Sequence, residues 1–319
     1  MLRTVVSIGA LLISATQGAA PAMAQDFPTK HPIKIIVAVN PGGATDNLAR
    51  VTAEFLGRRL GQTVIVENKP GASGTIGADY VNKAPADGYT IFIAGSEFAA
   101  VPATRKVPYK FDEMTYLIRG FTVSPLMYAS PHLQVSSLSE LVSHMKANPG
   151  KVKYGSTGIG AIVHMGMAMF EGAAGVKGLH IPYAGIAPVF NDLLAGHVDI
   201  SQGAPPFPAG VKVLGSIGST RNAAFPNLPT LEEVGVKNAT WDQWFGFLAP
   251  PNLPKPLADR LVAELSAVFK DPQAIAKYRS TVSFEPDPAP LIGEAYRRQV
   301  IAENKKWKTV VEREKIVVE

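Results

Sequence analysis

Hydrophobic and polar positions follow two different periods along the first third of the chain. Short β-branched runs at residues 33–39, 63–68 and 89–96 predict buried strands, because each run is too short to form a helix. Residues 45–60, between the first two runs, carry apolar side chains on one helical face, which is typical of an amphipathic helix. This alternation of strands and helices predicts a parallel, doubly wound sheet with helices on both faces.

A second series of strands and helices begins near residue 122. Predicted strands lie at residues 124–130, 178–185, 197–201 and 211–217, a strand with a glycine-rich turn lies at 151–160, and predicted helices lie at 136–150, 161–175 and 187–196. From Trp241 onward, the segment WDQWFGFLAP and the helices after it are expected to complete the first domain. Residues 294–316 predict an amphipathic surface helix.

The pattern therefore predicts two α/β domains that are joined by two crossings of the chain. Residues 25–122 and 246–319 form one domain, residues 123–245 form the other, and a ligand cleft lies between them. Open α/β sheets bind ligands at the carboxyl ends of their strands, so the loops at these ends are expected to face the cleft. The loops concerned are 40–46, 95–98, 155–160 and 183–187.

The N-terminal residues 1–24 have the pattern of a cleaved secretory signal. Arg3 precedes an apolar run at residues 5–20, and Ala22-Met23-Ala24 fits a small-residue cleavage site. A membrane anchor is the weaker alternative, because polar residues interrupt the run and it is shorter than the ~20 apolar residues of a span. The chain has no cysteine, hence no disulfide and no lipidated cysteine. We predict a monomeric protein of the periplasm.

Charge and motifs argue against several other functions. The formal net charge of +5 is spread without a basic stripe, so nucleic-acid binding is not supported. The six histidines form no closely spaced pair of the kind that metal sites use, and a copper site at His164 among methionines is less favoured than a packed core histidine. No Walker lysine, Gly-x-Ser-x-Gly elbow or spaced dinucleotide glycine motif occurs. No enzyme activity, cofactor or metal is therefore expected.

Several segments together resemble one protein family. These are PGGATDNLAR, LGQTVIVENKPGASGTIGADYVNKAPADGYT, KANPGKVKYGSTGIG, HIPYAGIAPVFNDLLAGHVD and WFGFLAP, and they span nearly the whole mature chain in order. They resemble the Bug-type substrate-binding proteins, the extracytoplasmic receptors of tripartite tricarboxylate transporters. The resemblance implies a two-domain, type II Venus-flytrap fold, a small carboxylate ligand and delivery to a membrane permease. A membrane signalling partner and a secreted hydrolase remain alternatives.

Backbone amides at helix starts offer a way to hold a carboxylate. Pro41-Gly42-Gly43 begins a helix, and Ser156, Thr157 and Gly158 are expected to form a second N-terminus on the opposite domain. A helix dipole stabilises an anion by up to ~2 kcal/mol, and each charge-assisted hydrogen bond contributes ~1.5–3 kcal/mol. Four or five such bonds reach the ~8 kcal/mol of a micromolar ligand without an arginine.

Four candidate residues have a structural alternative. Thr45 or Asp46 caps the helix or organises the loop at the ligand, where the family resemblance places this pair. Glu97 stands where family members mostly carry small or hydroxyl residues; it pairs with a cationic group of the ligand or, slightly favoured, is a solvated charge at the rim. Phe98 stacks on an aromatic ligand or packs at the hinge.

A further departure from the family pattern follows Asp199. The last aspartate of the usual Val-Asp-Leu-Met-Phe-Asp falls on Gly203, and the following connection is shorter, so that Phe207 either walls the pocket or packs in a surface loop. The full set of expected ligand contacts is Asn40, Gly43, Ala44, Thr45, Asp46, Ser96, Glu97, Phe98, Ser156, Thr157, Gly158, Tyr183, Ala187, Asp199 and Phe207.

Overall fold

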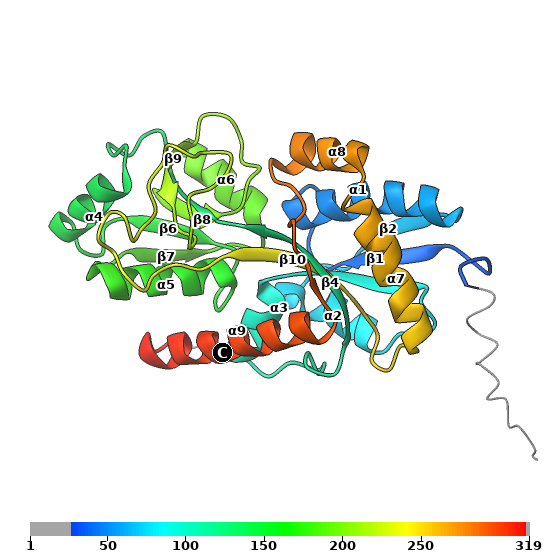
Figure 1. Cartoon of the computed structure of the whole chain (residues 1–319). Helices are drawn as coiled ribbons and strands as arrows, with labels where there is room; N and C mark the ends of the chain where they lie inside the picture. Colours follow the sequence, from blue (N-terminus) through cyan, green and yellow to red (C-terminus); the bar gives the residue numbers. More distant parts are fainter. Residues whose placement is uncertain (1–26, 317–319) are drawn as a thin grey trace, which may run out of the picture.

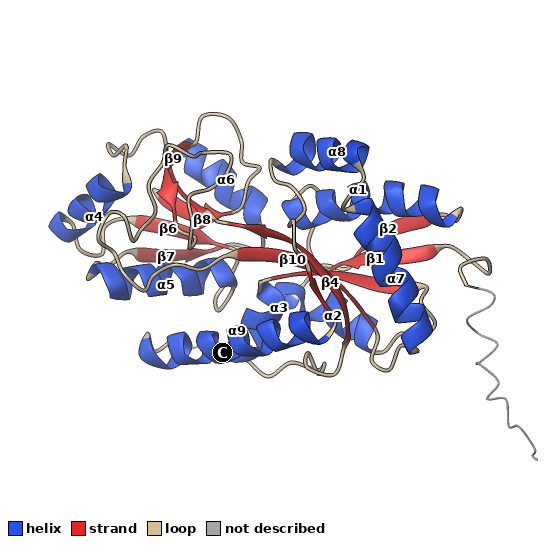
Figure 2. Ribbon diagram, in the orientation of Figure 1, coloured by secondary structure: helices blue, strands red, loops and turns tan. Residues whose placement is uncertain are grey.

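The computed structural model describes residues 27–316 and contains two sheets that lie side by side (Figure 1). The predicted signal peptide lies outside the described residues. Helices cover both faces of each sheet (Figure 2). Within residues 27–316, no helix combines the length and the apolar character that a membrane span requires.

The first sheet has six strands in the order β11-β4-β10-β3-β1-β2. β1, β2 and β3 are parallel, as the sequence predicts, whereas β10 runs antiparallel to β3 and to β4. Its strands are β1 (Ile33–Val37), β2 (Val64–Asn68), β3 (Thr90–Gly95), β4 (Thr115–Val123), β10 (Gln243–Ala249) and β11 (Leu291–Ile292). Its helices are α1 (Ala44–Leu60), α2 (Thr75–Asn82), α3 (Glu97–Thr104), α7 (Lys255–Val268), α8 (Pro272–Val282) and α9 (Glu294–Arg313), with a short 3-10 turn η2 at Ala72–Gly74.

The second sheet has five strands in the order β7-β6-β8-β5-β9. β6 is parallel to both β7 and β8, and β5 is antiparallel to both β8 and β9. Its strands are β5 (Leu126–Ala129), β6 (Lys153–Ser156), β7 (Leu179–Pro182), β8 (Ile200–Gly203) and β9 (Lys212–Ser216), and its helices are α4 (Leu138–Ala147), α5 (Ile162–Ala174) and α6 (Ile186–Ala195).

Two segments of the chain connect the sheets, and they are bonded to each other. The chain leaves the first sheet at the end of β4 and enters the second at Leu126; it returns at the start of β10. Between these strands, Ser124 Oγ donates to Asp242 Oδ1 at 3.2 Å. The backbone amide of Trp244 and the carbonyl of Asp242 both bond to Ser96 Oγ, at 2.9 and 3.2 Å. These contacts tie β3 to the connection.

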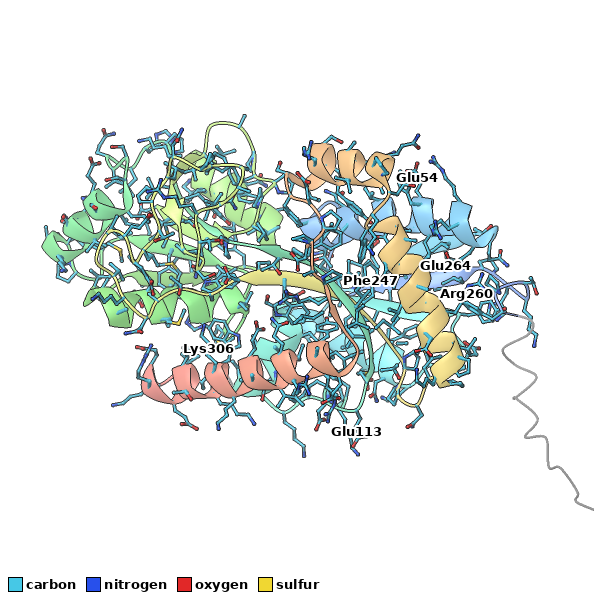
Figure 3. The ribbon with its side chains drawn as sticks, in the orientation of Figure 1. Glu54, Glu113, Phe247, Arg260, Glu264 and Lys306 are labelled. Atoms are coloured by element: carbon cyan, nitrogen blue, oxygen red, sulfur yellow. The ribbon has the colours of Figure 1, made fainter. Side chains whose placement is uncertain are left out.

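The C-terminal helix α9 spans both halves of the molecule. Tyr296 and Val300 pack in the core of the first sheet, whereas Trp307 and Val310 pack in the core of the second. Lys306, labelled in Figure 3, donates to the carbonyl of Thr240 at 3.1 Å. The sequence predicts an amphipathic surface helix here. The structure adds that its apolar face joins the two halves.

Gly120, in β4, lies against the ring of Phe269. A Cβ built on Gly120 would lie 2.3 Å from the nearest ring carbon, and the ring is enclosed by Phe121 and Tyr278. We therefore expect Gly120→Ala to lower the free energy of unfolding by about 1–3 kcal/mol, the usual cost of overpacking. Urea unfolding without ligand measures this loss.

Gly43→Ala serves as the control for Gly120→Ala, because nothing lies within 4 Å of a Cβ at Gly43. Equal stability of the two variants would show that the Phe269 ring moves aside without cost.

Candidate functional site

Helix α1 begins directly after the Pro-Gly-Gly corner, and its first amides are left uncapped. Gly43 is the N-cap residue, and no side-chain hydrogen bond caps this end. Gly42 has φ +94°, in the left-handed region that favours glycine. The alternative in which Thr45 or Asp46 caps α1 is wrong. The free amides of the first turn, which starts at Ala44, form an electropositive helix end.

Asp46 organises the loop that leads into α1. It is 1% exposed, and its carboxylate accepts hydrogen bonds from the Gly42 amide at 3.0 Å and from Asn68 Nδ2 at 2.9 Å. Arg50 adds Nε and Nη2 bonds at 2.9 and 3.0 Å. Burial alone raises the pKa of Asp46, but the bonds from Arg50, Gly42 and Asn68 outweigh it and hold that pKa below its ordinary value. The negative charge is neutralised within the loop.

The first turn of α6 lies opposite this corner. Its N-cap is Gly185, with φ +149° and no side-chain cap, and its first helical residue is Ile186. A Cβ built on Gly185 would lie 3.5 Å from Asn40 Nδ2, so the loops of the two halves meet here. Ala187 is exposed in the same turn. The N-terminus of α6 therefore lies beside the loop that leads into α1.

Tyr183, which precedes α6, has both its hydroxyl and its backbone amide bonded within the second half of the molecule. Its hydroxyl donates to Asp192 Oδ2 at 2.6 Å, and its amide donates to the carbonyl of Ser156 at 2.9 Å. Burial first, and then Asp192, raises the pKa of the Tyr183 hydroxyl to about 12. This hydroxyl is therefore bonded to a side chain in the second half of α6.

The loop after β6 differs from the prediction. α5 begins at Ile162 with Ala161 as its N-cap, so Ser156, Thr157 and Gly158 precede the helix end and do not form it. Ser156 is fully buried, and its hydroxyl contacts the Gly158 amide at 3.2 Å and His180 Nε2 at 2.6 Å. The hydroxyl of Ser156 holds the loop in shape, while Thr157 is half-buried.

Arg105 joins this loop to the first half of the molecule. The sequence alone does not indicate this contact. Its Nη2 donates to the carbonyl of Ile159 at 2.5 Å, and its Nε is buried without a partner in the described structure. Arg105 directly follows α3. A basic residue is common at the C-terminal end of any solvated helix, so its presence here does not by itself indicate a contact. Only the three-dimensional placement shows that it bridges the two halves.

Two stacked imidazoles lie behind the β6 loop. The rings of His164 and His180 are 4.0 Å apart with an interplanar angle of 8°, and the Gly160 amide donates to His164 Nδ1 at 3.0 Å. Burial first, then His164, lowers the pKa of His180 to about 4. Parallel rings direct their lone pairs along parallel planes, so they do not converge on one ion. The described residues contain no cluster of three or more metal-binding side chains.

Acidification is expected to destabilise the protein between about pH 6.5 and pH 4 through His180. The unfolded imidazole takes up a proton near its ordinary pKa, the folded one only near 4, so the unfolded state binds more protons between them. Since the ring is only partly buried, we expect His180 to account for about 1–2 kcal/mol of the loss. Urea unfolding of His180→Asn at pH 7.5 and pH 4.5 should show a smaller loss than the wild type.

His132→Asn, which changes an exposed imidazole, is the control for His180→Asn. An unchanged pH dependence in His180→Asn would contradict the assignment.

The residues after β3 form the start of α3 and not an open loop. The Ser96 hydroxyl is used by the β10 connection, which removes it from the ligand contacts. Glu97 is mostly buried, and the carboxyl lies beside Gly95 and the amide of Gln243. Burial raises the pKa of Glu97 above its ordinary value. The favoured interpretation as a solvated rim charge is therefore wrong.

Both candidate aromatic contacts pack inside their own half. Phe98 is 3% exposed and stacks on Tyr109 with ring centres 5.5 Å apart, so it cannot stack on a ligand. Phe207 packs against Tyr128 and Phe225, at 5.8 and 5.9 Å. Its surface-loop alternative is the observed one.

Asp199 lies at the wrong end of its strand to contact a ligand. It precedes β8, and its carboxylate accepts the amide of Lys153 at the start of β6. The ligand end of these parallel strands is the opposite one. Gly203, at that end, has φ +159°, and Ala204 packs against the core of the first sheet.

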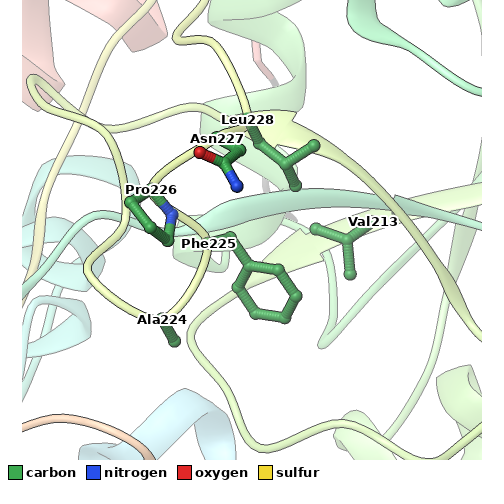
Figure 4. A pocket seen from close by; sticks show the side chains of 6 residues that line it. All are labelled: Val213, Ala224, Phe225, Pro226, Asn227 and Leu228. Atoms are coloured by element: carbon green, nitrogen blue, oxygen red, sulfur yellow. The ribbon is translucent and has the colours of Figure 1, made fainter.

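Two hollows of the described surface lie away from this corner. One, of about 450 Å³, is formed around Phe225 by Val213 and residues 224–228 (Figure 4). The other, of about 520 Å³, lies beside His164 and His180 and is bordered by residues 314–316. Neither includes a residue of the α1 or α6 first turns.

Comparisons with known proteins agree with this architecture. The family model of tripartite tricarboxylate transporter family receptors (TctC) matches residues 48–316. A UPF0065 protein of Bordetella pertussis is 37% identical over 269 residues, which cover 82% of this chain and 81% of that protein. The periplasmic binding protein BugD is 31% identical with a TM-score of 0.81, covering 91% of this chain and 99% of that one.

An R. palustris protein solved with adipate is 28% identical with a TM-score of 0.84, covering 92% of this chain and 99% of that one. The predicted family and the predicted fold class are confirmed. The family consists of solute-binding proteins of the periplasm and not of enzymes. The chain belongs to the tripartite tricarboxylate transporter receptor family, the Bug-type periplasmic solute-binding proteins, and has their two-domain fold.

Proposed function

We propose that this receptor binds a small organic carboxylate between the N-termini of α1 and α6 and delivers it to a tripartite tricarboxylate-type permease. The observation that carries the proposal is the meeting of the two corners, where Asn40 Nδ2 lies 3.5 Å from a Cβ position on Gly185. Both helix ends are uncapped, and both direct free amides outward. The R. palustris relative was solved with adipate, a dicarboxylate, which supports the ligand class.

The available donors are sufficient for a micromolar ligand. The first turn of α1 supplies the amides of Ala44 and Thr45, and that of α6 supplies those of Ile186 and Ala187. Charge-assisted hydrogen bonds of ~1.5–3 kcal/mol each give the ~8 kcal/mol of micromolar affinity after the cost of association. The Asp46 charge does not oppose the ligand, because Arg50 and the Gly42 amide neutralise it.

We further propose that residues 27–123 with 243–316 and residues 124–242 move as two bodies that close over the ligand; the predicted boundaries at 123 and 246 shift because β4 ends at Val123 and β10 begins at Gln243, both in the first sheet. The Ser124–Asp242 hydrogen bond marks the connection about which they turn. The bond from Arg105 to Ile159 and the span of α9 limit how far they separate. Closure would exclude water and strengthen every amide contact.

A thermal-shift panel tests the ligand class. Succinate, adipate, malate, aspartate and benzoate are compared with glucose and glycerol. A ligand at a hundred times its Kd stabilises the protein by ~2.7 kcal/mol. We expect at least one acid and no neutral solute to do so. A shift with a neutral solute alone would refute the carboxylate proposal. Loss of uptake of the same acid on deletion of this receptor would identify transport, and an intact uptake would favour a sensory partner.

The structure gives little support to the alternative that the protein is a hydrolase. Ser156 and His180 form a hydroxyl–imidazole pair at 2.6 Å, as such an enzyme requires. However, Ser156 is fully buried, and its oxygen also accepts the amide of Gly158. The pair is therefore placed to support the loop.

A further inference from the structure

We propose that Glu97 binds a positively charged nitrogen of the ligand, so that the preferred ligand is a zwitterion, a small acid that also carries an ammonium or a cationic ring nitrogen. This inference rests on the proposed function, because the carboxylate of the same ligand binds the helix ends. Glu97 would recognise the positive charge of the ligand, which the backbone amides cannot bind.

Glu97 lies at the same edge of the sheet as the α1 corner. It directly follows the end of β3, whose parallel neighbour β1 leads to α1, and neighbouring strands are about 4.8 Å apart. Gly95 lies on the face of β3 that carries Ile91 and Ile93, which pack in the core beneath α1. The Glu97 carboxyl oxygens lie 2.6 and 2.8 Å from a Cβ position on Gly95. The carboxyl therefore lies on the α1 side of the sheet.

The carboxyl of Glu97 has no counter-ion. None of the ion pairs of the described residues includes it, and the side chain beside it is the neutral amide of Gln243, whose Nε2 lies 3.0 Å from the same Cβ position. The remaining partners of the carboxyl are backbone amides of Gly95 and Glu97. A mostly buried carboxylate without a counter-ion is costly, and a cation from the ligand removes this cost.

The charges of this corner then favour an acid that carries a cationic nitrogen over the matched acid without one. The first turns of α1 and α6 attract one carboxylate, whereas Glu97 repels a second carboxylate at the neighbouring strand end. Two other roles of Glu97 are distinguishable by experiment. In one, a protonated Glu97 donates a hydrogen bond to an acid. In the other, Glu97 only stabilises the start of α3.

Isothermal titration of the mature protein with matched pairs of compounds tests the proposal. The pairs are aspartate and succinate, glutamate and glutarate, and N-methylnicotinate and benzoate. In each pair only the first compound carries a cationic nitrogen. We expect one zwitterion to bind about 10- to 100-fold more tightly than its partner acid, as a charge-assisted contact of ~1.5–3 kcal/mol provides. Glu97→Gln should weaken that zwitterion by about 100-fold and strengthen the partner acid, so that the preference disappears or reverses.

Glu97→Asp, which keeps the charge, should retain a preference for the zwitterion, and melting temperatures of both variants confirm that they fold. A wild type that prefers the plain acids would overturn the inference and leave the proposed function intact. So would a Glu97→Gln protein with unchanged zwitterion affinity. If neither member of any pair binds but adipate or malate does, the inference fails and the proposed function stands; if no acid binds, both fail.

Discussion

Replacing Ala44 with proline should weaken carboxylate binding by about 10- to 100-fold without lowering the melting temperature. Proline at the first helical position removes one amide hydrogen that has no partner within the helix, and its φ fits the helix. The residue before it, Gly43, has φ −82° and ψ 174°, the extended backbone that a following proline requires. Isothermal titration with the acid selected by the thermal-shift panel measures the loss.

The same substitution is possible on the opposite side. Ile186 is the first residue of α6, and Gly185 before it has ψ 179°. Ile186→Pro should therefore cost a similar factor, and the double variant should lose about the product of the two, because the amides belong to separate helices. Ala44→Ser keeps the amide and serves as the control. If Ala44→Pro binds as tightly as Ala44→Ser, the amides of α1 do not hold the carboxylate.

The sheets that hold this site were largely predictable from local patterns. The β-branched runs of β1, β2 and β3 and the amphipathic face of α1 follow from side-chain periodicity alone. α3 is not predictable from its sequence, EFAAVPAT, because this segment is apolar on nearly all sides and contains Pro102, so it shows no helical stripe. β4 was missed because Arg119 and Gly120 interrupt its apolar run.

Only the part of the site that follows from the strand topology could be predicted from the sequence. Parallel strands fix which loops lie at the carboxyl edge, and this places the corners after β1 and β7. Which corners meet depends on how two separate sheets are placed, so the sequence alone points to Ser156 rather than to the N-terminus of α6. Asp199 directly precedes β8, so it lies at the end of the strand opposite to the expected ligand contacts. Ser96 and Phe98 face protein neighbours that are distant in sequence, Asp242 and Tyr109.

Replacing Asp46 with alanine should lower the free energy of unfolding by about 2–4 kcal/mol, because several charge-assisted hydrogen bonds end on its carboxylate. The Gly42 amide and Asn68 lose the buried carboxylate that accepts their hydrogen bonds, and the corner before α1 is no longer held. We therefore expect the affinity for the carboxylate to fall by about tenfold or more as well. Urea unfolding and titration calorimetry measure the two effects.

The effect of Asp46→Ala should also depend on pH in a defined direction. The folded-state pKa of Asp46 lies below the ordinary value of 3.8, so its stabilisation is complete above that pH and is lost as the pH falls through the folded-state pKa. The difference between wild type and variant should therefore shrink in acid. Asp259→Ala is a matched control, since Asp259 pairs with Lys255 at i,i+4 spacing but is 62% exposed, and should cost at most about 0.5 kcal/mol. Equal losses in the two variants would mean that the hydrogen bonds of the buried Asp46 carboxylate contribute no more than a surface ion pair.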